Sequence, residues 1–568
     1  MARGTETKAG SAGAPVDWVT RAADDALRHA GEGNLVTVAS GASPSGPIHL
    51  GNLREFITPH FVAEELRSRG ITVRHLHSWD DYDRFRKVPV GAPAEWAEHI
   101  GRPLSGVPDP WECHPSWAEH FKDPLRATLA ELGVEMDEIS QTEMYRAGAY
   151  REQILVAVSR REQIERVLSR HRTKAAPVAE SEQEAAALAD SVALEEDAGT
   201  GDLARFPFRP WCSQCGRDTT TATAYDEETH DIAYTCSVCD YEGSTNLATE
   251  DGGKLVWKAD WPMRWAYEKV DFEPAGLDHM TPGSSYTVGQ DLVSSVFGWR
   301  APERVTYAFV GFAGVQKMSS SSGGVPTGAD ALRILEAPIL RWLYVRRAPK
   351  QAFDIDFGPQ VVRLYDEWDA LGRKAADPAK RDAAVLAFER ASSTSTVGTL
   401  PTPGVVVPFR VLSSVADVTA GSAEQISRIV GSVGHEHTGV DQLEPRLSRA
   451  MSWTAEYVPA EERTTVRENP DTERLAELSE REAAWVGLLL AGLETADDLD
   501  AVTALVYGVP KLALGMGLDD PPTEAVKAHQ KQFFGLLYGL LVDAERGPRL
   551  PTLVMALGVD RLRYLLGG

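Results

Sequence analysis

The segment at residues 41–52 constrains the fold of this chain more than any other. Its sequence, GASPSGPIHLGN, places glycines and prolines between two patterned segments. The short apolar run before it, at residues 35–39, predicts a buried strand, and the apolar residues of 53–69 recur at helical spacing. A strand–loop–helix corner presents backbone N–H groups and the positive end of a helix dipole, so it suits a phosphate. The alternative interpretation is a tight turn that carries a surface histidine.

A second apolar run, at residues 71–77, completes a strand–helix–strand unit and predicts a parallel sheet. Three aspartates, Asp80, Asp81 and Asp83, come directly after this run. Because open α/β sheets bind ligands at the carboxyl ends of their strands, we expect these carboxylates at the binding edge. Helix capping or a surface salt bridge is the alternative for any one of them.

Composition narrows the class of protein. The 568 residues are enough for three or four domains, and 43% hydrophobic with 25% charged residues is typical of a soluble globular protein. No apolar run reaches the roughly 18 residues that span a membrane. Residues 1–15 lack the apolar segment of a secretory signal and predict a loose tail. We therefore expect a cytoplasmic protein with no membrane partner.

The formal net charge is −25, which counts against nucleic-acid binding by charge alone. Any RNA partner requires a local positive surface on this chain. Part of the acid is concentrated in residues 175–204, where eight carboxylates occur without a single Lys or Arg. This composition predicts a solvated acidic insertion.

Four of the five cysteines form two C-x-x-C pairs with twenty residues between them, and the fifth, Cys113, is isolated. The spacing fits a four-thiolate zinc site, and the Thr and Tyr alternation between the pairs is typical of a zinc ribbon. Four thiolates leave no open coordination position, so the site should be structural. Chance pairing or a redox dithiol is the alternative. The predicted ligands are Cys212, Cys215, Cys236 and Cys239.

The rest of the chain is predicted mainly from periodicity. Residues 150–171 predict a helix, and residues 305–310 predict the last buried strand of the sheet. The tryptophans at 257, 261 and 265 share one face of a helix, or alternate on a strand. Residues 392–408 are rich in Ser, Thr, Pro and Gly and predict a linker or exposed loop, and residues 409–568 predict five or six helices and no strand.

Two short motifs carry a family resemblance. Residues 49–52 (HLGN) and 317–321 (KMSSS) resemble the HIGH and KMSKS motifs of class I aminoacyl-tRNA synthetases. The fourth position of the second motif, usually lysine, is Ser320, which leaves Lys317 as the only cation of that loop. The further order SWDDYD, paired C-x-x-C, DWPMRW and DFEPAGLDH resembles class I lysyl-tRNA synthetases over roughly residues 20–565.

The resemblance implies an α/β Rossmann-like class I synthetase catalytic domain with an inserted zinc-ribbon module, followed by an all-α C-terminal anticodon-binding region. The implied domains are a catalytic domain at 16–335, a helical connecting domain at 336–400 and an anticodon-binding domain at 401–568. Within the catalytic domain, the helical and zinc-ribbon insertion takes residues 90–250 and the acidic insertion residues 175–204.

The implied reaction is ATP-dependent ligation of L-lysine to tRNA(Lys) through a lysyl-adenylate, with release of AMP and pyrophosphate. The resemblance implies ATP with Mg²⁺, and His49, Asn52 and Lys317 as catalytic residues. The implied ATP-binding set is Pro44, Ser45, Gly46, His49, Gly51, Asn52, Lys317, Met318, Ser319, Ser320 and Ser321. A buried ammonium needs a carboxylate, so Asp80 or Asp81 is expected to hold lysine, with Trp257 and His279 as the side-chain pocket.

Because the chain is acidic, we expect anticodon bases to be read by stacking rather than through phosphates. The candidates are Trp485, Phe533, Phe534, Arg546 and Arg549. Three alternatives stay open. They are a synthetase for another amino acid, chiefly glutamate, a paralogue that activates an amino acid without charging tRNA, and a zinc-ribbon nucleic-acid-binding protein without activity.

Overall fold

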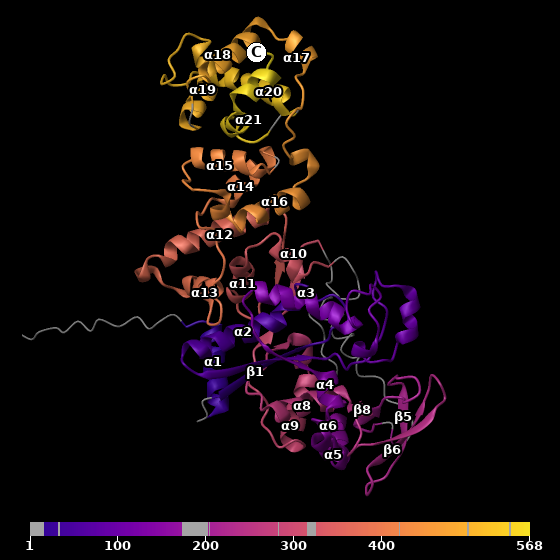
Figure 1. Cartoon of the computed structure of the whole chain (residues 1–568). Helices are drawn as coiled ribbons and strands as arrows, with labels where there is room; N and C mark the ends of the chain where they lie inside the picture. The colour runs from indigo at the N-terminus through magenta and orange to yellow at the C-terminus, as the bar shows by residue number, and fades with distance from the viewer. Residues whose placement is uncertain are drawn as a thin grey trace, which may run out of the picture. The chain divides into compact units, whose positions relative to one another are not determined.

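The computed structural model divides the chain into two compact units (Figure 1). The described residues are 16–31, 35–172, 203, 205–281, 283–314, 325–419, 421–496, 499–542, 544 and 547–568. Unit 1 comprises Met1–Ala331, Leu340–Ile355 and Leu371–Leu400, and unit 2 comprises Leu332–Ile339, Asp356–Ala370 and Pro401–Gly568. The predicted tail, the KMSSS loop and nearly all of the acidic insertion lie outside the described residues.

A parallel sheet forms the centre of unit 1. Strand β1 (Leu35–Ala42) pairs with β2 (Thr72–Trp79), which pairs with β3 (Asp137–Ser140), and both pairings are parallel. Single parallel bridges continue the sheet from Val38 to Phe272 and from Phe272 to Glu303, beside the parallel pair β9 (Ala275–Gly276) and β10 (Thr306–Tyr307). The predicted strand–helix–strand unit is therefore confirmed, with α2 (Leu53–Ser68) as its helix.

Helices cover both faces of this sheet. Successive side chains of β1 point to opposite sides, and apolar residues on each side pack against helices. Val36 and Val38 pack with alanines of α1 (Trp18–Ala30) and with Val62 of α2. Ala39 packs on the other face, with tryptophans of α8 (Trp257–Glu268) and Tyr286 of α9 (Ser285–Ser295). The central strands are thus enclosed on both sides, and their carboxyl ends remain the edge at which a ligand can bind.

The other elements of unit 1 follow the chain between and around these strands. Its further helices include α3 (Trp117–Glu131), α4 (Gln141–Arg146), α5 (Arg151–Ser159), α6 (Arg161–Arg172), α10 (Gly328–Leu332) and α13 (Ala383–Ser392). Its further strands are β4 (Phe208–Pro210), β5 (Thr220–Tyr225), β6 (Asp231–Cys236), β7 (Glu242–Asn246), β8 (Gly253–Leu255), β11 (Val310–Phe312), β12 (Phe353–Ile355), β13 (Ser393–Thr394) and β14 (Gly398–Thr399). Helix α10 ends one residue into unit 2, and helices α11 (Ala337–Val345) and α12 (Gln360–Ala375) are also divided between the two units.

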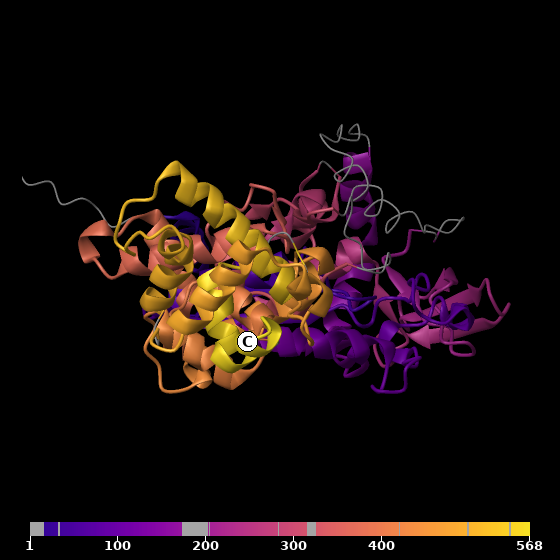
Figure 2. The same cartoon turned by 90° about the horizontal axis from the view of Figure 1, so that it is seen from above.

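Strands β5, β6 and β7 form a separate antiparallel sheet within unit 1. Figure 1 shows this sheet set to one side of the parallel sheet, and Figure 2 shows its magenta strands from above. The four paired cysteines lie at its end, where Cys212, Tyr234 and Cys236 form a small buried cluster. This position confirms the predicted strands between the C-x-x-C pairs.

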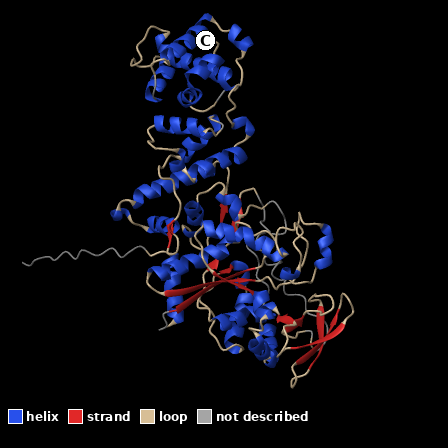
Figure 3. Cartoon of the chain, viewed as in Figure 1, coloured by secondary structure: helices blue, strands red, loops and turns tan. Residues whose placement is uncertain are grey.

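The described part of unit 2 consists of helices and loops (Figure 3). Beyond residue 400 its helices are α14 (Phe409–Val418), α15 (Ala423–Ser432), α16 (Arg446–Tyr457), α17 (Thr472–Ala476), α18 (Glu480–Gly492), α19 (Leu499–Leu512), α20 (Glu524–Val542) and α21 (Leu550–Leu565). The prediction of five or six helices was therefore too low. The additional helices are stabilised by tertiary contacts that their local sequence does not reveal. Within α16, Arg446 is buried and pairs with Glu336 at 2.6 Å and Asp369 at 2.9 Å.

Three local predictions were wrong. Residues 305–310 are not one buried strand, because β10 and β11 pair with different partners, β9 and β12, and residues 305–309 are only half-buried. Residues 150–171 form two helices, α5 and α6, that meet at Arg160. The predicted loop at 392–408 contains the short antiparallel pair β13–β14. In each case the local pattern was too short to exclude the observed arrangement.

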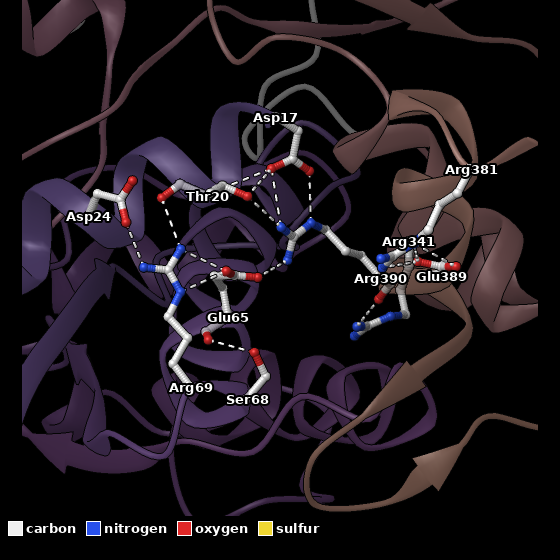
Figure 4. Close-up of polar contacts among 10 residues, drawn as sticks. All are labelled: Asp17, Thr20, Asp24, Glu65, Ser68, Arg69, Arg341, Arg381, Glu389 and Arg390. Atoms are coloured by element: carbon white, nitrogen blue, oxygen red, sulfur yellow. Dashed lines mark hydrogen bonds and ion pairs between the residues drawn. The ribbon is translucent and has the colours of Figure 1, made fainter. Parts of the chain in front are cut away.

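A cluster of ion pairs joins α13 to α1 and α2 in unit 1 (Figure 4). Arg390 lies between two carboxylates, at 2.7 Å from Asp17 and 2.6 Å from Glu65. Asp17 also caps α1 by accepting a hydrogen bond from the Thr20 amide at 2.9 Å. Arg381, by contrast, pairs with Glu389 on the surface, with both side chains more than a third exposed.

We expect Arg390→Met to lower the free energy of unfolding by about 3 kcal/mol, because it removes the cation paired with Asp17 and one of the two cations paired with Glu65. The matched change Arg381→Met removes an exposed pair and should cost less than about 1 kcal/mol. Thermal unfolding of the two variants beside the wild type measures the difference. Equal shifts in the melting temperature would contradict a special role for Arg390.

Candidate active site

The corner at residues 41–52 connects the end of β1 to the start of α2. Two turns close it, with the Asn52 amide donating to the His49 carbonyl at 2.9 Å and the Leu53 amide donating to the Leu50 carbonyl at 3.2 Å. The Tyr344 hydroxyl donates to the Leu50 carbonyl at 2.7 Å, and the Leu50 amide bonds to Pro326. The corner is therefore fixed from both sides by segments far along the chain.

The side chain of Asn52, the residue before α2, makes no capping bond to the first amides of the helix. Its oxygen accepts instead from the His49 amide at 3.2 Å. His49 is largely buried, its Nδ1 has no hydrogen-bond partner, and burial lowers its pKa to about 4. A neutral imidazole with an unused nitrogen and an uncapped helix start together form a site able to bind a polar group.

The other residues predicted to bind ATP divide between described and undescribed parts of the chain. Pro44 and Gly46 are buried, Ser45 is exposed and Gly51 is half-buried, all within the corner. The Ser45 carbonyl accepts a hydrogen bond from the indole of Trp117 at 3.2 Å, which ties the loop to α3. The predicted loop residues Lys317, Met318, Ser319, Ser320 and Ser321 lie outside the described residues.

The two aspartates predicted to hold an ammonium group are both paired with cations of the chain itself. Asp80 lies 2.7 Å from Arg264, and burial raises the pKa of its carboxyl to about 6. Asp81 pairs with Lys122 at 2.7 Å. The remaining hydrogen bonds of Asp81 come from Ser140 and Thr142. The Asp81 carboxylate is thus fully engaged, whereas the Asp80 carboxylate bonds, among the described residues, to Arg264 through one oxygen.

A third carboxylate, Glu55, was not foreseen from the sequence. It lies in the first turn of α2, half-buried, and accepts hydrogen bonds from the Gly41 amide at 3.3 Å and from the Tyr307 hydroxyl. Within the described residues neither partner is a cation. Removal from water, with smaller contributions from nearby Glu273 and Asp278, raises the pKa of Glu55 to about 8, against the opposing hydrogen bonds. An acidic group without a cation suits a cationic ligand.

The sequence around Glu55 contains a signal from which a role at the site could be predicted. It comes six residues after His49, on the face of α2 that returns to the corner, where a charged residue amid buried neighbours is unusual. Tyr307, by contrast, has no local signal, because its contact with Glu55 depends on the sheet that joins β9 and β10.

The two predicted side-chain pocket residues belong to one aromatic group. Trp257 and Trp261 on α8 stack with ring centroids 5.2 Å apart, and His279 packs edge-on against Trp261 at 5.3 Å. Trp257 and His279 are half-buried, and Nδ1 of His279 is buried without a partner. Tyr307, which bonds to Glu55, pairs in the sheet with Gly276, three residues before His279, so the aromatic group and Glu55 lie in the same region.

The four paired cysteines come together as predicted. The sulfurs of Cys212 and Cys239 are 3.6 Å apart, and those of Cys215 and Cys236 are 3.7 Å apart. These distances exclude disulfides and match the roughly 3.8 Å that tetrahedral coordination at a Zn–S distance of about 2.3 Å produces. The donor set and its geometry therefore fit a tetrahedral metal ion.

Cys113, predicted to be isolated, has three neighbours able to bind metal. Asp109, Cys113, His114 and His120, here called the Asp109 cluster, offer ligand atoms that all lie within 4.8 Å of one another. Nδ1 of His114 lies 3.1 Å from the Cys113 sulfur, and Nδ1 of His120 lies 3.3 Å from it. One carboxylate, one thiol and two imidazoles form a donor set suited to zinc. The sequence signal, two histidines close to Cys113, was overlooked.

The candidates for stacking on anticodon bases differ in exposure. Trp485 and Phe533 are buried and pack on each other at 5.8 Å, so they serve the core of unit 2. Phe534 is half-buried, Arg549 is exposed and Arg546 lies outside the described residues.

Among the described helices none combines the length and apolar character needed to cross a bilayer.

Comparison with known proteins gives consistent matches along the chain. The family described as "tRNA synthetases class I (K)" matches residues 16–397. A lysine–tRNA ligase of Streptomyces coelicolor is 49% identical, with 100% of this chain and 99% of that protein covered. Relatives with the same name from Thermococcus kodakarensis (34% identical, 96% and 99% covered) and Treponema pallidum (28% identical, 97% and 98% covered) match over a similar span.

The raised pKa of Glu55 predicts a pH-dependent cost to the ligand-free fold. Because the folded protein holds this proton more tightly than the unfolded chain, ionisation between about pH 4.5 and 8 destabilises the fold. Glu55→Gln should therefore be more stable than the wild type by on the order of 2 kcal/mol at pH 8, with the difference vanishing toward pH 4. Thermal unfolding across this range measures it.

Glu65→Gln is the matched control, because ion pairs with Arg390 and Arg69 lower the pKa of Glu65, against its partial burial. That change should destabilise the protein at pH 8. If the difference in stability between Glu55→Gln and the wild type did not change with pH, the pKa of Glu55 would not be raised in the folded protein.

Proposed function

Since this chain belongs to the class I tRNA synthetase (K) family, we propose that it ligates L-lysine to tRNA(Lys) at the expense of ATP. The observation that carries the proposal is the 49% identity to a lysine–tRNA ligase along the whole chain. The Glu55 carboxylate supports it independently, because its hydrogen-bond partners are not cations and a substrate with two ammonium groups requires available carboxylates.

In the first step the lysine carboxylate attacks the α-phosphate of ATP, forming lysyl-adenylate and releasing pyrophosphate. In the second step the terminal ribose of tRNA attacks the acyl carbon and AMP leaves. Positioning and charge stabilisation carry such phosphoryl chemistry, so the protein needs oriented donors rather than a nucleophile. ATP brings Mg²⁺, which neutralises phosphate charge.

For the adenylate step we propose that His49 and Asn52 hydrogen-bond the ATP phosphates or ribose at the start of α2. The low pKa of His49 favours a neutral imidazole, and its free Nδ1 supports the assignment. The rest of the corner, Pro44, Ser45, Gly46 and Gly51, shapes the backbone around the nucleotide. Lys317, with the loop through Ser321, supplies the cation for the β- and γ-phosphates.

For lysine we propose that Glu55, oriented by Tyr307, receives one ammonium group and that Trp257 and His279 line the carbon stem. Asp80 remains a candidate for the second ammonium group, through the oxygen that Arg264 does not take. Asp81 is a weaker candidate, because Lys122, Ser140 and Thr142 already occupy it. A glutamate substrate is disfavoured, because its side-chain carboxylate would meet carboxylates in this pocket.

We propose that residues 401–568 read the anticodon and that residues 336–400 connect them to the catalytic domain at 16–335. The all-helical composition of unit 2 supports this assignment. Because Trp485 and Phe533 are committed to the core, the stacking groups are Phe534, Arg549 and Arg546. A protein that activated lysine without charging tRNA would have little use for this region.

We also infer two bound zinc ions. The Cys212, Cys215, Cys236 and Cys239 site closes a zinc ribbon built on β5–β7, and its four thiolates make it structural. The Asp109 cluster is the second site, held by the loop before α3 and by His120 in the first turns of that helix. Its position beside Trp117, which bonds to the Ser45 carbonyl, means that it stabilises a segment in contact with the nucleotide corner.

Aminoacylation of total tRNA, scored separately for each standard amino acid, tests the proposed function. We expect lysine alone to be attached, and lysine alone to support exchange between ATP and pyrophosphate. Exchange with lysine but no attachment to tRNA would favour the tRNA-independent paralogue. Attachment of glutamate would overturn the assignment of the pocket.

Elemental analysis of protein purified without chelator should find two zinc ions per chain. Cys239→Ser should lose one ion, His120→Ala the other, and the double variant both, because each change removes a ligand from a different site. One ion in the wild type, retained in His120→Ala, would remove the Asp109 cluster from the assignment.

A further inference from the structure

Glu273 lies in the segment that continues the central sheet, and it is only 4% exposed. Its amide donates to the Glu303 carbonyl at 3.0 Å, so its backbone is fixed by the neighbouring strand segment. Its two carboxylate oxygens accept from two different indoles of α8. Oε1 receives the Trp261 N–H at 3.1 Å, and Oε2 receives the Trp265 N–H. The sheet thereby determines the orientation of two tryptophan rings.

Trp261 stands at the centre of the aromatic group. Its ring stacks on Trp257 at an interplanar angle of 23° and meets His279 edge-on at 74°. Trp257 and His279 are the two residues proposed to line the lysine stem, whereas Glu273 itself is covered by the tryptophans. Trp257 has one further polar anchor, its indole N–H bonding to Ser285 Oγ at 3.0 Å.

We infer that Glu273 is a positioning residue for lysine selection, acting through Trp261 to fix Trp257 and His279 against the carbon stem of the substrate. The inference rests on the proposed function, because it assumes the pocket assigned there. Two acceptors for two indoles prevent either ring from turning independently. A glutamine at this position keeps the size of the side chain but offers one carbonyl oxygen, and its amide N–H₂ meets the second indole donor without an acceptor.

The position of the pocket walls determines how well the site distinguishes substrates whose side chains differ in length. One methylene in an apolar pocket is worth about 10- to 200-fold in specificity, provided that the walls do not move. A loosened Trp257 and His279 should therefore weaken lysine binding and reduce the preference for lysine over ornithine, which has one methylene fewer. ATP binding at the corner does not use these rings and should not change.

The test is ATP–pyrophosphate exchange with Glu273→Gln. We expect the KM for lysine to rise by about tenfold or more and the lysine-to-ornithine ratio of kcat/KM to fall by about tenfold. The kcat and the KM for ATP should stay within about threefold of the wild type, since ground-state contacts to lysine are what the change removes. An unchanged lysine KM would overturn the inference.

Asp271→Asn is the matched control. Asp271 is a buried carboxylate in the same segment, but it accepts from the Thr37 amide at 3.0 Å and contacts His29 rather than any tryptophan. We expect it to lower the melting temperature without raising the KM for lysine. Equal effects of the two changes on that KM would mean that Glu273 only stabilises the fold, and the inference would be wrong.

Two further variants test the proposed pocket and this inference separately. They also keep the inference testable if Glu273→Gln folds poorly. Trp257→Ala must raise the KM for lysine. If it does not, the pocket and the inference both fail, whereas a rise with Trp257→Ala but not with Glu273→Gln overturns the inference alone. Trp261→Phe keeps an aromatic side chain, though a smaller one, and loses the indole donor, so it should weaken lysine binding and discrimination in the same direction as Glu273→Gln. A wild-type lysine KM in Trp261→Phe would contradict the inference.

Discussion

Two carboxylates of the central sheet region, Glu55 and Glu273, are withdrawn from water without an ion pair among the described residues, and the proposed lysine site depends on both. Removal from water raises the pKa of Glu55 to about 8 and that of Glu273 to about 7, the latter against two indole hydrogen bonds. Such groups cost stability in the free protein. For Glu55 the cost is consistent with a site for a cationic substrate, because a bound ammonium group would balance its charge, whereas Glu273 is occupied by the two indoles.

The rest of unit 1 holds these carboxylates in place. The parallel sheet brings the Glu55 turn, the Glu273 segment and Tyr307 together, although more than 250 residues separate the first from the last. Other aspartates of the same edge are neutralised internally, Asp81 by Lys122 and Asp80 by Arg264. Asp81 thus fixes the structure, whereas Asp80 keeps one oxygen that Arg264 does not take.

Periodicity and motifs predicted much of this from the sequence. The strand–helix–strand unit, the corner at residues 41–52 and the four-cysteine site follow from local patterns, because spacing alone determines which residues meet. The pairing of Asp81 with Lys122, the contact of Tyr307 with Glu55 and the neighbours of Cys113 could not be derived with the same certainty. Each depends on which segments the tertiary fold brings together. The split of residues 305–310 into two strands has the same cause.

Calorimetric titration of the protein with lysine tests the central claim most directly. At pH 7 Glu55 is mostly protonated in the free protein, so binding an ammonium group should expel a proton, and the measured heat should depend on the ionisation enthalpy of the buffer. We predict release of close to one proton per lysine at pH 7, and far less with Glu55→Gln. Binding of lysine without proton release, or with the same release in Glu55→Gln, would contradict the account.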